Sequence, residues 1–581
     1  MSLPLQPPPA FPGAKSPFVP EKGFPDWPGI LGRWGCDWTK VVAAARGKRV
    51  LVGSNTGMHG AVTTLDSILA VALTVRGAQV ARMFCDGVLQ GCLIPVYGEA
   101  TPVDMIADRG LVSRLCKACF SRGTNTHRPL GLPEYRFSSL LRPQDYPRAQ
   151  ELAASVPFAE IQSWEMDGLP VGEHAYAGAL RYFATGDLAD QERAEDILRR
   201  YLEGAILTAF VYDRMIDEFQ PEIAVLHHGI YSPQGVAAAV CRRRGVRVVT
   251  WVVAYRKNCF IFSHDDTYHH TLMDEPTTEW EDVALTETQR QAVESYLSSR
   301  ATGGRDWIYF HKDPEVSFDT FAQARAIDAR KPIVAVLTNV MWDAQLHYPA
   351  NAFPGMREWV LETIDYFRKR TDLEVVIRVH PAEVRGAVKS RQRVADEVNK
   401  VFGSLPPHIH IVGPDEEAST YAIAAAADTV VIYGTKMGTE LAPTGKPIIV
   451  AGEAWIKNKG LTQDARDKAH YFALLDQLPV GDGGKWRPDR DRALLYAYHF
   501  FFRRMIPLPF LEPNGTGAMF DLKLGKLDDL DPGRYPGLDT IMDGILLGRP
   551  FTYKAERYGI HDVGTERRKS VDLIIGEKTN F

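Results

Sequence analysis

Short apolar runs rich in β-branched residues recur through the second half of the chain, and they limit the possible folds more than any other feature. They occupy residues 332–337, 373–379, 409–412, 429–433 and 447–450. Such runs are typical of strands that are buried on both faces of a parallel sheet. Segments with helical spacing of apolar residues, such as 356–370 and 420–426, lie between them. The alternation predicts a doubly wound α/β domain.

The first half of the chain opens in the same order. A strand pattern at 48–53 leads through a Gly-rich loop into a helical pattern at 61–76, and a second strand pattern follows at 79–85. Further strand patterns lie at 223–227 and 246–253. We therefore expect an α/β fold with two Rossmann-like doubly wound domains that face a central cleft.

Changes in composition along the chain indicate where these units begin and end. Nine prolines in the first 28 residues favour an extended arm. The predicted units are the Pro-rich arm (1–45), an N-terminal Rossmann-like domain (46–315) with a helical insertion at about 130–220, a C-terminal Rossmann-like domain (316–485), and a helix that packs back, with a tail (486–581).

The charge balance and the cysteine content exclude several classes of protein. The 67 basic and 72 acidic residues give a net charge of −5, so no overall positive field favours nucleic acid. No run approaches the roughly 20 apolar residues of a membrane-spanning helix, and the N-terminus lacks the apolar core of a secretory signal. Seven cysteines, an odd number, fit a reducing compartment better than a disulfide framework. We expect a cytoplasmic protein that does not bind nucleic acid.

The segment Tyr433–Glu440 has the strongest signal for a ligand site, because ligands of open α/β sheets bind where a strand ends and the next helix begins. The first amide groups and the dipole of a helix favour a phosphate. Lys436 would add a positive charge, and Glu440 would accept hydrogen bonds from ribose hydroxyls. The alternative is that Gly434 and Gly438 only allow the helix to pack closely on the strand. The candidate binding residues here are Gly434, Thr435, Lys436, Gly438, Thr439 and Glu440.

A second strand end in the same half carries His380. It follows the strand pattern at 373–379 and precedes Pro381, which prevents the strand from continuing. Its imidazole would donate a hydrogen bond to a phosphate oxygen, with Arg378 in support.

A third strand end lies after residues 332–337. Thr338 and Asn339 would bind a phosphate or a sugar there, and Trp342 would stack on a base. The alternative for Trp342 is an aromatic residue that fills the interface between the two domains.

In the first half, three residues at strand ends are candidates for a general base. His59 lies in the loop after the first strand, Asp86 ends the second, and His228 ends the third. An imidazole with a near-neutral pKa can deprotonate a substrate hydroxyl. The polar run 262–270 could also line a substrate site or, from its His and Asp content, hold a metal. The alternative for each histidine is a structural or merely exposed side chain.

Four cysteines, Cys85, Cys92, Cys116 and Cys119, are grouped as C-x6-C…C-x2-C. Thiolates grouped in this way can hold a structural zinc ion, and the closing C-x2-C is a usual half-site. The opening gap is wider than usual. The alternatives are buried free thiols and a redox pair at Cys116 and Cys119.

Residues 493–504 are aromatic and basic at helical spacing. Such a helix can contact a membrane or a lipid-linked substrate. We interpret these residues instead as a C-terminal helix that packs back on the core.

Together, these motifs resemble one known family. The run Tyr433–Gly452, followed by Lys459–Thr462, resembles the donor-domain signature of the bacterial capsule polysaccharide biosynthesis glycosyltransferases, GT-B enzymes that include the β-Kdo transferases. His380-Pro381 looks like the HP motif of that group and of the sialyltransferases that use CMP-sugars. The similarity is most specific across residues 330–465. Two departures are present: Tyr433-Gly-Thr replaces the usual Ser-Thr or Ser-Ser, and Cys85 precedes Asp86 where the family base has an acidic neighbour.

The resemblance implies a GT-B-like fold and the transfer of a sugar from a nucleotide-sugar donor, CMP-activated donors included, to a glycan or lipid-linked acceptor in surface polysaccharide synthesis. His380 would contact the donor phosphate, and Asp86 or His59 would be the base of an inverting transfer. Catalysis would need no cofactor, so any zinc would be structural. A lipid-linked acceptor would bring the protein to the inner-membrane face as a peripheral partner. The alternatives are a nucleotide-sugar epimerase, a glycerophosphotransferase, and a non-catalytic sugar-binding subunit.

Overall fold

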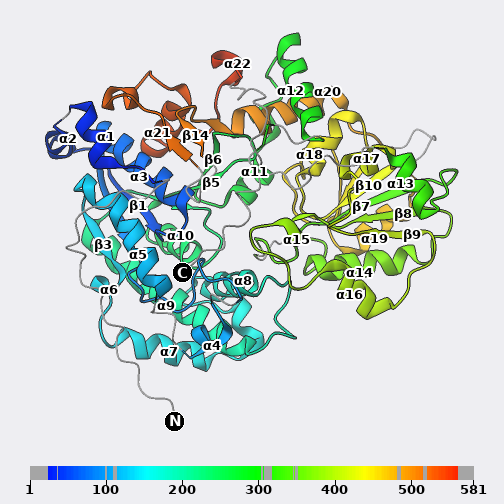
Figure 1. The fold of residues 1–581 in the computed structure, drawn as a ribbon, viewed down its shortest axis with the longest axis horizontal. Helices are drawn as coiled ribbons and strands as arrows, with labels where there is room; N and C mark the ends of the chain where they lie inside the picture. The colour runs from blue at the N-terminus through cyan, green and yellow to red at the C-terminus, as the bar shows by residue number, and fades with distance from the viewer. Residues whose placement is uncertain are drawn as a thin grey trace.

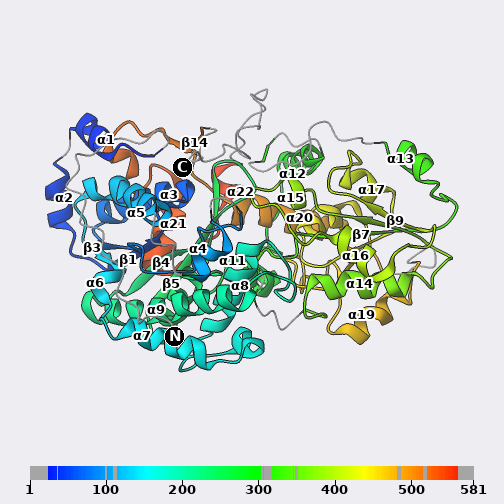
Figure 2. The same ribbon diagram turned by 60° about the horizontal axis from the view of Figure 1, so that its bottom comes forward.

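Two α/β units, each built on its own sheet, make up the protein in the computed structural model (Figures 1 and 2). The structure describes residues 24–35, 37–98, 101–108, 114–301, 305–306, 317–344, 346, 351–479, 486–514 and 520–560. Residues 1–23 of the predicted arm and 561–581 of the predicted tail lie outside these ranges. The described end of the arm is not extended, because residues 27–34 and 38–44 form helices that pack on the first core.

The first sheet has the strand order β13-β6-β5-β4-β1-β2-β3. The strands β1 to β5 are mutually parallel, whereas β6 runs antiparallel to β5. Every residue of β4 is buried, which explains why this strand reads as a continuous apolar run. The strands are β1 (Arg49–Asn55), β2 (Gln79–Phe84), β3 (Glu134–Arg136), β4 (Ile223–His227), β5 (Arg247–Val253), β6 (Cys259–His264) and β13 (Ile506–Pro507).

The second sheet has six parallel strands in the order β12-β11-β10-β7-β8-β9. The strands are β7 (Ile333–Leu337), β8 (Glu374–Arg378), β9 (Ile409–Val412), β10 (Thr429–Ile432), β11 (Ile448–Val450) and β12 (Gln463–Asp464). In both sheets, therefore, the parallel strands follow the Rossmann order 3-2-1-4-5. The strand order reverses between β1 and β4 in one sheet and between β7 and β10 in the other, and ligands of such sheets bind at these switch points. The predicted fold class is confirmed.

Helices cover both faces of the first sheet. The helix α3 packs on one face in a core shared with α1, α2 and α21, while α7, α8, α9 and α10 build the core on the other face. The predicted insertion at about 130–220 contains most of the second group, but it also contributes the edge strand β3. The helices are α1 (Trp27–Trp34), α2 (Trp38–Ala44), α3 (Gly60–Val75), α4 (Val103–Ala107), α5 (Arg114–His127), α6 (Phe137–Leu140), α7 (Asp145–Ser155), α8 (Val171–Phe183), α9 (Ala194–Phe219), α10 (Gln234–Arg243), α11 (Tyr268–Asp274) and α12 (Glu287–Arg300).

The second sheet also lies between two helical layers. On one face α14, α16 and α19 share a core, and on the other α13, α17, α18 and α20 share another. The helices are α13 (Phe318–Arg325), α14 (Met356–Phe367), α15 (Ala382–Arg385), α16 (Val394–Phe402), α17 (Thr420–Ala426), α18 (Met437–Leu441), α19 (Lys468–Leu475) and α20 (Arg490–Tyr498).

The C-terminal segment returns from the second unit to the first. After α20, a π-helical turn (His499–Arg504) leads into β13, which pairs with β6, and α21 (Pro536–Leu547) and α22 (Ala555–Tyr558) follow. This segment therefore supplies a strand to the first sheet, in addition to the predicted helix and tail. Phe500, Phe501 and Phe502 are at most 3% exposed, so the aromatic stretch belongs to the core and does not face a membrane.

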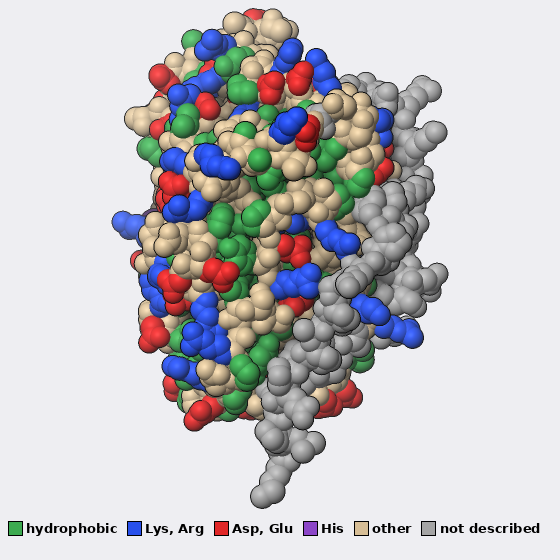
Figure 3. Space-filling view, turned by 90° about the vertical axis from the view of Figure 1, so that its left-hand side faces the viewer, with side chains coloured by type: hydrophobic (Ala, Val, Ile, Leu, Met, Phe, Trp, Pro, Cys, Tyr) green, Lys and Arg blue, Asp and Glu red, His purple; other side chains and the backbone are tan. Residues whose placement is uncertain are grey.

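On the side formed by the first unit, the described surface has no extended patch of charges of one sign. Over the described part of the face in Figure 3, Lys and Arg side chains are interspersed with Asp and Glu, and hydrophobic side chains are scattered among them. Among the helices that the structure describes, none combines the length and the apolar character needed to span a bilayer.

Candidate active site

A cavity of about 360 Å³ lies where the carboxyl ends of the second sheet's strands face the first unit. This volume is within the range of small-molecule sites. The second unit lines it with the loops after β7, β8 and β10. The first unit contributes the loop after β5, the start of α11 and the end of α12. The polar and aromatic lining residues are Tyr255, Tyr268, His269, Arg300, Asp306, Thr338, Asn339, Asp343, Arg378, His380, Thr420, Tyr421, Thr435, Lys436 and Trp455.

His380 is held in one orientation by the ends of two neighbouring strands. Its backbone N–H donates to Thr338 Oγ1 at 3.2 Å, and its Nδ1 accepts from the backbone N–H of Ala382 at 3.0 Å. Because Nδ1 is an acceptor, the ring proton of the neutral tautomer is on Nε2. The side chain therefore offers an N–H donor in the cavity wall, as the phosphate contact predicted from the sequence requires.

Arg378, predicted to assist at the phosphate, holds the neighbouring loop together instead. Its guanidinium donates to the backbone oxygens of Gly413 and Glu416, the latter at 3.2 Å, and to Thr420 Oγ1 at 3.4 Å. Burial lowers the pKa of Arg378 to about 10. Thr338 is similarly used, since its hydroxyl donates to Arg378 O at 3.4 Å. Both residues line the cavity, and these hydrogen bonds hold its wall in shape.

The turn from β10 into α18 contains the predicted phosphate loop. A Cβ atom at Gly434 would lie 3.2 Å from Glu453 O and 3.4 Å from Asn339 Nδ2, so the backbone there needs a small residue. At Gly438, a Cβ would lie 2.8 Å from a methyl group of Ile456. Gly438 therefore serves close packing, the alternative stated for it. Thr435 Oγ1 accepts from Met437 N at 3.4 Å, and Thr439 is buried in the short helix.

Glu440 lies in a buried charge network that the sequence does not reveal. Its Oε1 accepts from Lys436 Nζ at 2.9 Å, and its Oε2 lies 3.0 Å from Arg300 Nε and 2.5 Å from the hydroxyl of Tyr421. Burial alone would raise the pKa of Glu440, but Arg300 and Lys436 outweigh burial and hold this pKa at about 2. Arg300 also forms an ion pair with Asp306. Glu440 therefore fixes the loop to α12, and a ribose contact would have to displace one of these partners.

Trp342 points away from the cavity. Its Nε1 donates to Ser390 Oγ at 3.0 Å, and its ring packs with Ala184 of the first unit and with Val340. The prediction that it stacks on a base is therefore wrong, and the alternative, an aromatic residue at the interface, is correct. Asn339 does line the cavity.

The predicted base Asp86 lies away from the cavity lining. Its carboxylate accepts hydrogen bonds from the backbone N–H of Ser138, at 3.0 Å, and from the Ser138 hydroxyl. Asp86 is 3% exposed and joins the loop after β2 to the start of α6. This position follows from the strand order, because β2 is one strand removed from the switch point.

His59 and His228 do lie at the switch point of the first sheet, but beneath the cavity lining. Their rings flank His227, at centroid distances of 5.3 Å and 4.3 Å. Burial lowers the pKa of His59 to about 4 and lowers that of His228 well below its usual range. Both are therefore neutral at pH 7, and neither has the near-neutral pKa that suits a general base.

One residue connects this histidine group to the cavity. The ring of Tyr231 lies 5.1 Å from that of His228, and its hydroxyl donates to Asp343 Oδ1 at 2.8 Å. The same hydroxyl accepts from Ala344 N at 2.9 Å. Asp343 is exposed and lines the cavity. It follows β7 in the run that also contains Trp342, so its place at a strand end was a signal that the sequence interpretation did not use.

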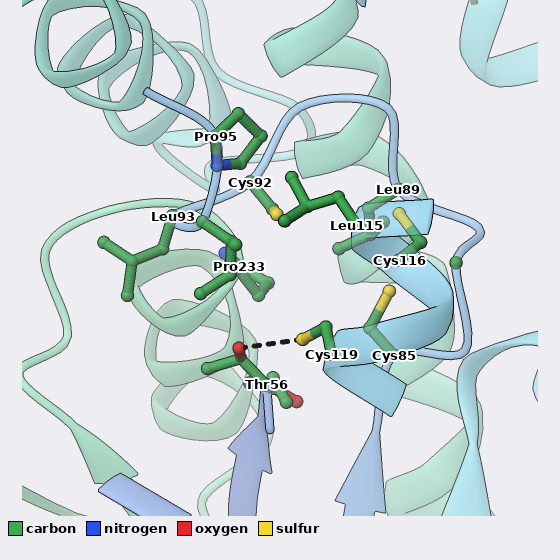
Figure 4. A pocket seen from close by; sticks show the side chains of 13 residues that line it. Thr56, Cys85, Leu89, Cys92, Leu93, Pro95, Leu115, Cys116, Cys119 and Pro233 are labelled. Carbon is green, nitrogen blue, oxygen red and sulfur yellow. Dashed lines mark hydrogen bonds between the residues drawn. The ribbon is translucent and has the colours of Figure 1, made fainter. Parts of the chain in front are cut away.

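The four cysteines line a second pocket, at the carboxyl ends of β1 and β2 (Figure 4). Cys119 Sγ lies 3.2 Å from Thr56 Oγ1 and accepts from Gly57 N at 3.3 Å. Burial, together with the neighbouring thiols, raises the pKa of Cys92 to about 12 and raises the pKa values of Cys85 and Cys116 further. In the part of the chain that the structure describes, no three His, Cys, Asp or Glu side chains are arranged to hold a metal ion. Structural zinc therefore stays a prediction without geometric support.

The second unit's part of this site lies in a segment that matches a known family. Residues 289–476 match the model of the family described as capsule polysaccharide biosynthesis protein. The family resemblance is confirmed over this segment. The matched segment contains every lining residue that the second unit contributes to the cavity. It also contains Arg300 of the first unit.

Solved structures give more distant likenesses, and no curated protein matches the chain. The β-Kdo 2,4 transferase KpsC of Thermosulfurimonas dismutans is 12% identical over 53% of this chain and 86% of its own, with a TM-score of 0.32. The UDP-GlcNAc 2-epimerase of Neisseria meningitidis is 11% identical over 61% of this chain and 92% of its own, with a TM-score of 0.23. The α,α-trehalose 6-phosphate synthase of Burkholderia multivorans is 12% identical over 78% and 95%, with a TM-score of 0.28. These likenesses are too distant to assign an activity.

Proposed function

We propose that the protein is a glycosyltransferase of capsule or related surface polysaccharide synthesis, which moves a sugar from a nucleotide-sugar donor to a glycan or lipid-linked acceptor. One observation carries the proposal: the His380 imidazole, the loop before α18 and the Asp343 carboxylate line a single cavity between two Rossmann-like units. The family match over residues 289–476 supports the same class of activity.

On the donor side, the leaving phosphate binds at the second switch point. The N–H of His380 Nε2 stabilises the negative charge that develops there. Lys436 adds a cation at the start of the helix. These groups supply the charge compensation for which other transferases use a divalent ion, and we propose that catalysis is independent of metal.

On the acceptor side, Asp343 takes the proton of the attacking hydroxyl. Asp306 and Asp343 are the carboxylates among the described lining residues; Asp306 forms an ion pair with Arg300, and Asp343 is oriented by the hydrogen bond from Tyr231. The hydroxyl oxygen forms a bond to the anomeric carbon as the bond to the phosphate oxygen breaks, and Asp343 receives the proton. Attack from the face opposite the leaving group inverts the anomeric centre.

The test is a thermal-shift screen with CMP, CDP, UDP, GDP and common nucleotide sugars, followed by product analysis. A ligand that binds only the folded protein raises its melting temperature. We expect one nucleotide class to stabilise the protein, with that shift lost in His380→Ala and kept in Asp343→Asn. Asp343→Asn should then reduce transfer by a factor of about 10²–10⁴. Conversion of the nucleotide sugar in the absence of any acceptor would instead identify an epimerase. No stabilisation by any nucleotide would overturn the proposal.

A further inference from the structure

Four aromatic side chains form one wall of the cavity, and the proposed chemistry of the donor phosphate does not use them. We call Tyr255, Tyr268, His269 and Trp455 the aromatic wall. The ring centroid of Trp455 lies 5.7 Å from that of Tyr255, 6.0 Å from that of Tyr268 and 5.5 Å from that of His269. The rings of Tyr268 and His269 are 4.3 Å apart. The four rings therefore form one continuous surface.

The wall is held in place from behind. Trp455 stacks on Phe500 of the π-helical turn at a centroid distance of 5.3 Å and an interplanar angle of 28°, and its backbone oxygen accepts from the Tyr496 hydroxyl at 2.5 Å. At its other end, Tyr255 has Lys436 Nζ 5.0 Å above its ring. A rigid aromatic surface loses little conformational freedom when a ligand binds to it.

Most of the wall belongs to the first unit, although its Tyr255 end adjoins Lys436 of the second. Tyr255 follows β5, and Tyr268 and His269 begin α11, so three of its four members come from the first unit. His380 and Thr435 belong to the second unit. In the inverting transfer proposed above, the acceptor must reach the anomeric carbon from the side away from the leaving phosphate, and the first unit, which supplies three of the four rings, is the partner of the second unit across the cavity.

The chemistry of the wall suits a sugar ring. A pyranose has flat patches of C–H groups with hydroxyls around their rim, and it packs those patches on aromatic faces while its hydroxyls bind polar neighbours. Polar neighbours are present, because Asp343 and Asp306 line the same cavity. Burial lowers the pKa of His269 to about 3, so at pH 7 its ring is uncharged and acts as a further aromatic face.

We propose that the aromatic wall is the acceptor subsite and that it binds the terminal sugar ring of the acceptor glycan. The identification of the bound sugar as the acceptor rests on the proposed function. The binding of a saccharide to the wall does not depend on that function.

Saturation-transfer difference NMR on the full chain tests the inference, with lactose, chitobiose, CMP and UDP as the probes. In the wild-type protein we expect saturation of the ring C–H protons of at least one disaccharide. Tyr268→Ala should reduce that signal at least threefold, whereas Tyr268→Phe, which keeps the ring, should retain it. The nucleotide signals should persist in both variants. Circular dichroism and thermal unfolding establish that each variant is folded, and His269→Ala provides a second test if Tyr268→Ala is not.

Three outcomes would overturn the inference: no saturation of either disaccharide, an equal disaccharide signal in wild type and in Tyr268→Ala, or a loss confined to nucleotide base protons, which would make the wall a base-stacking site. Failure of the proposed function looks different. If neither nucleotide binds while the disaccharide signal still depends on Tyr268, the subsite stands and the chain is a sugar-binding protein.

Discussion

The hydroxyl of Tyr231 donates a hydrogen bond to Asp343 Oδ1 at 2.8 Å and so joins the loop after β4 in the first unit to the loop after β7 in the second. Tyr231 is 5% exposed and also accepts from the backbone of Ala344, so it fixes both the carboxylate and the loop that carries it. The switch points of the two sheets are thus linked through one side chain.

Tyr231→Phe should therefore lower turnover without lowering donor affinity. A hydrogen bond to a charged group contributes about 1.5–3 kcal/mol, which corresponds to a loss of about 10- to 100-fold in kcat. Steady-state kinetics with the donor class found in the thermal-shift screen measure the effect. Tyr558→Phe, at an exposed position remote from the cavity, is the matched control. A wild-type kcat in Tyr231→Phe would show that Asp343 does not need this orientation.

His380→Ala should remove one N–H donor to the leaving phosphate. The loss of a single such donor typically costs about 10²–10³ in kcat, because the charge it stabilises develops in the transition state. His380→Gln places an amide N–H in the same region and should recover part of the rate. If the alanine and glutamine variants are equally impaired, the side chain acts through the hydrogen bond that its Nδ1 accepts from Ala382 N, and the Nε2 proton is irrelevant to catalysis.

Glu440→Gln should destabilise the protein more than it changes donor binding. It removes the negative charge that Arg300 and Lys436 share, and removal of one partner of a buried ion pair costs about 3–5 kcal/mol. Differential scanning calorimetry should show a lower melting temperature. Glu416→Gln, whose partner Arg325 is more exposed, should show a smaller effect. A large loss of donor affinity with unchanged stability would restore the ribose contact inferred from the sequence.

The metal content of purified protein tests the zinc hypothesis directly. The raised pKa values of Cys85, Cys92 and Cys116 favour neutral thiols, and metal binding requires thiolates. We therefore expect EDTA to leave the melting temperature unchanged and elemental analysis to find much less than one zinc per chain. About one zinc per chain, lost together with stability on chelation, would mean that the four cysteines rearrange around a metal.

The strands that could be predicted are those buried on both faces. The pattern at 223–227 coincides with β4 and the pattern at 332–337 contains β7, because the burial of every residue of these strands leaves an apolar run. The strand β6, which lies between β5 and β13, has no counterpart among the strand patterns, because its last residues fall in the polar run 262–270. The strand β13 has only two residues, and only its pairing with β6 identifies it.

The same reasoning applies to the site. His380 and the Gly434 loop could be located because they directly follow predicted strands. Arg300 and Tyr231 could not, because their partners Glu440 and Asp343 are more than one hundred residues away in the sequence and meet them only in the folded chain. Asp86 was chosen as a strand end, but strand order, which single segments do not encode, places β2 beside the switch point and not at it.

Glu383 gives the fold a specific dependence on pH. It lies in the first turn of α15, is 1% exposed, and accepts through Oε1 from the backbone N–H of Val394 at 2.9 Å. Burial raises the pKa of Glu383 from 4.5 to about 7. Between these two values the folded chain binds a proton that the unfolded chain releases, so stability falls as pH rises through this window and is lowest above pH 7.

Glu383→Gln keeps the acceptor oxygen and removes the charge. The melting temperature of the variant should equal that of the wild type at pH 5 and exceed it at pH 8. Between these pH values the difference in unfolding free energy should grow by up to roughly 3 kcal/mol. Thermal unfolding at both pH values measures this, with Glu358→Gln on α14 as the matched control. A difference that does not change between pH 5 and pH 8 would mean that the Glu383 carboxylate titrates in its ordinary range.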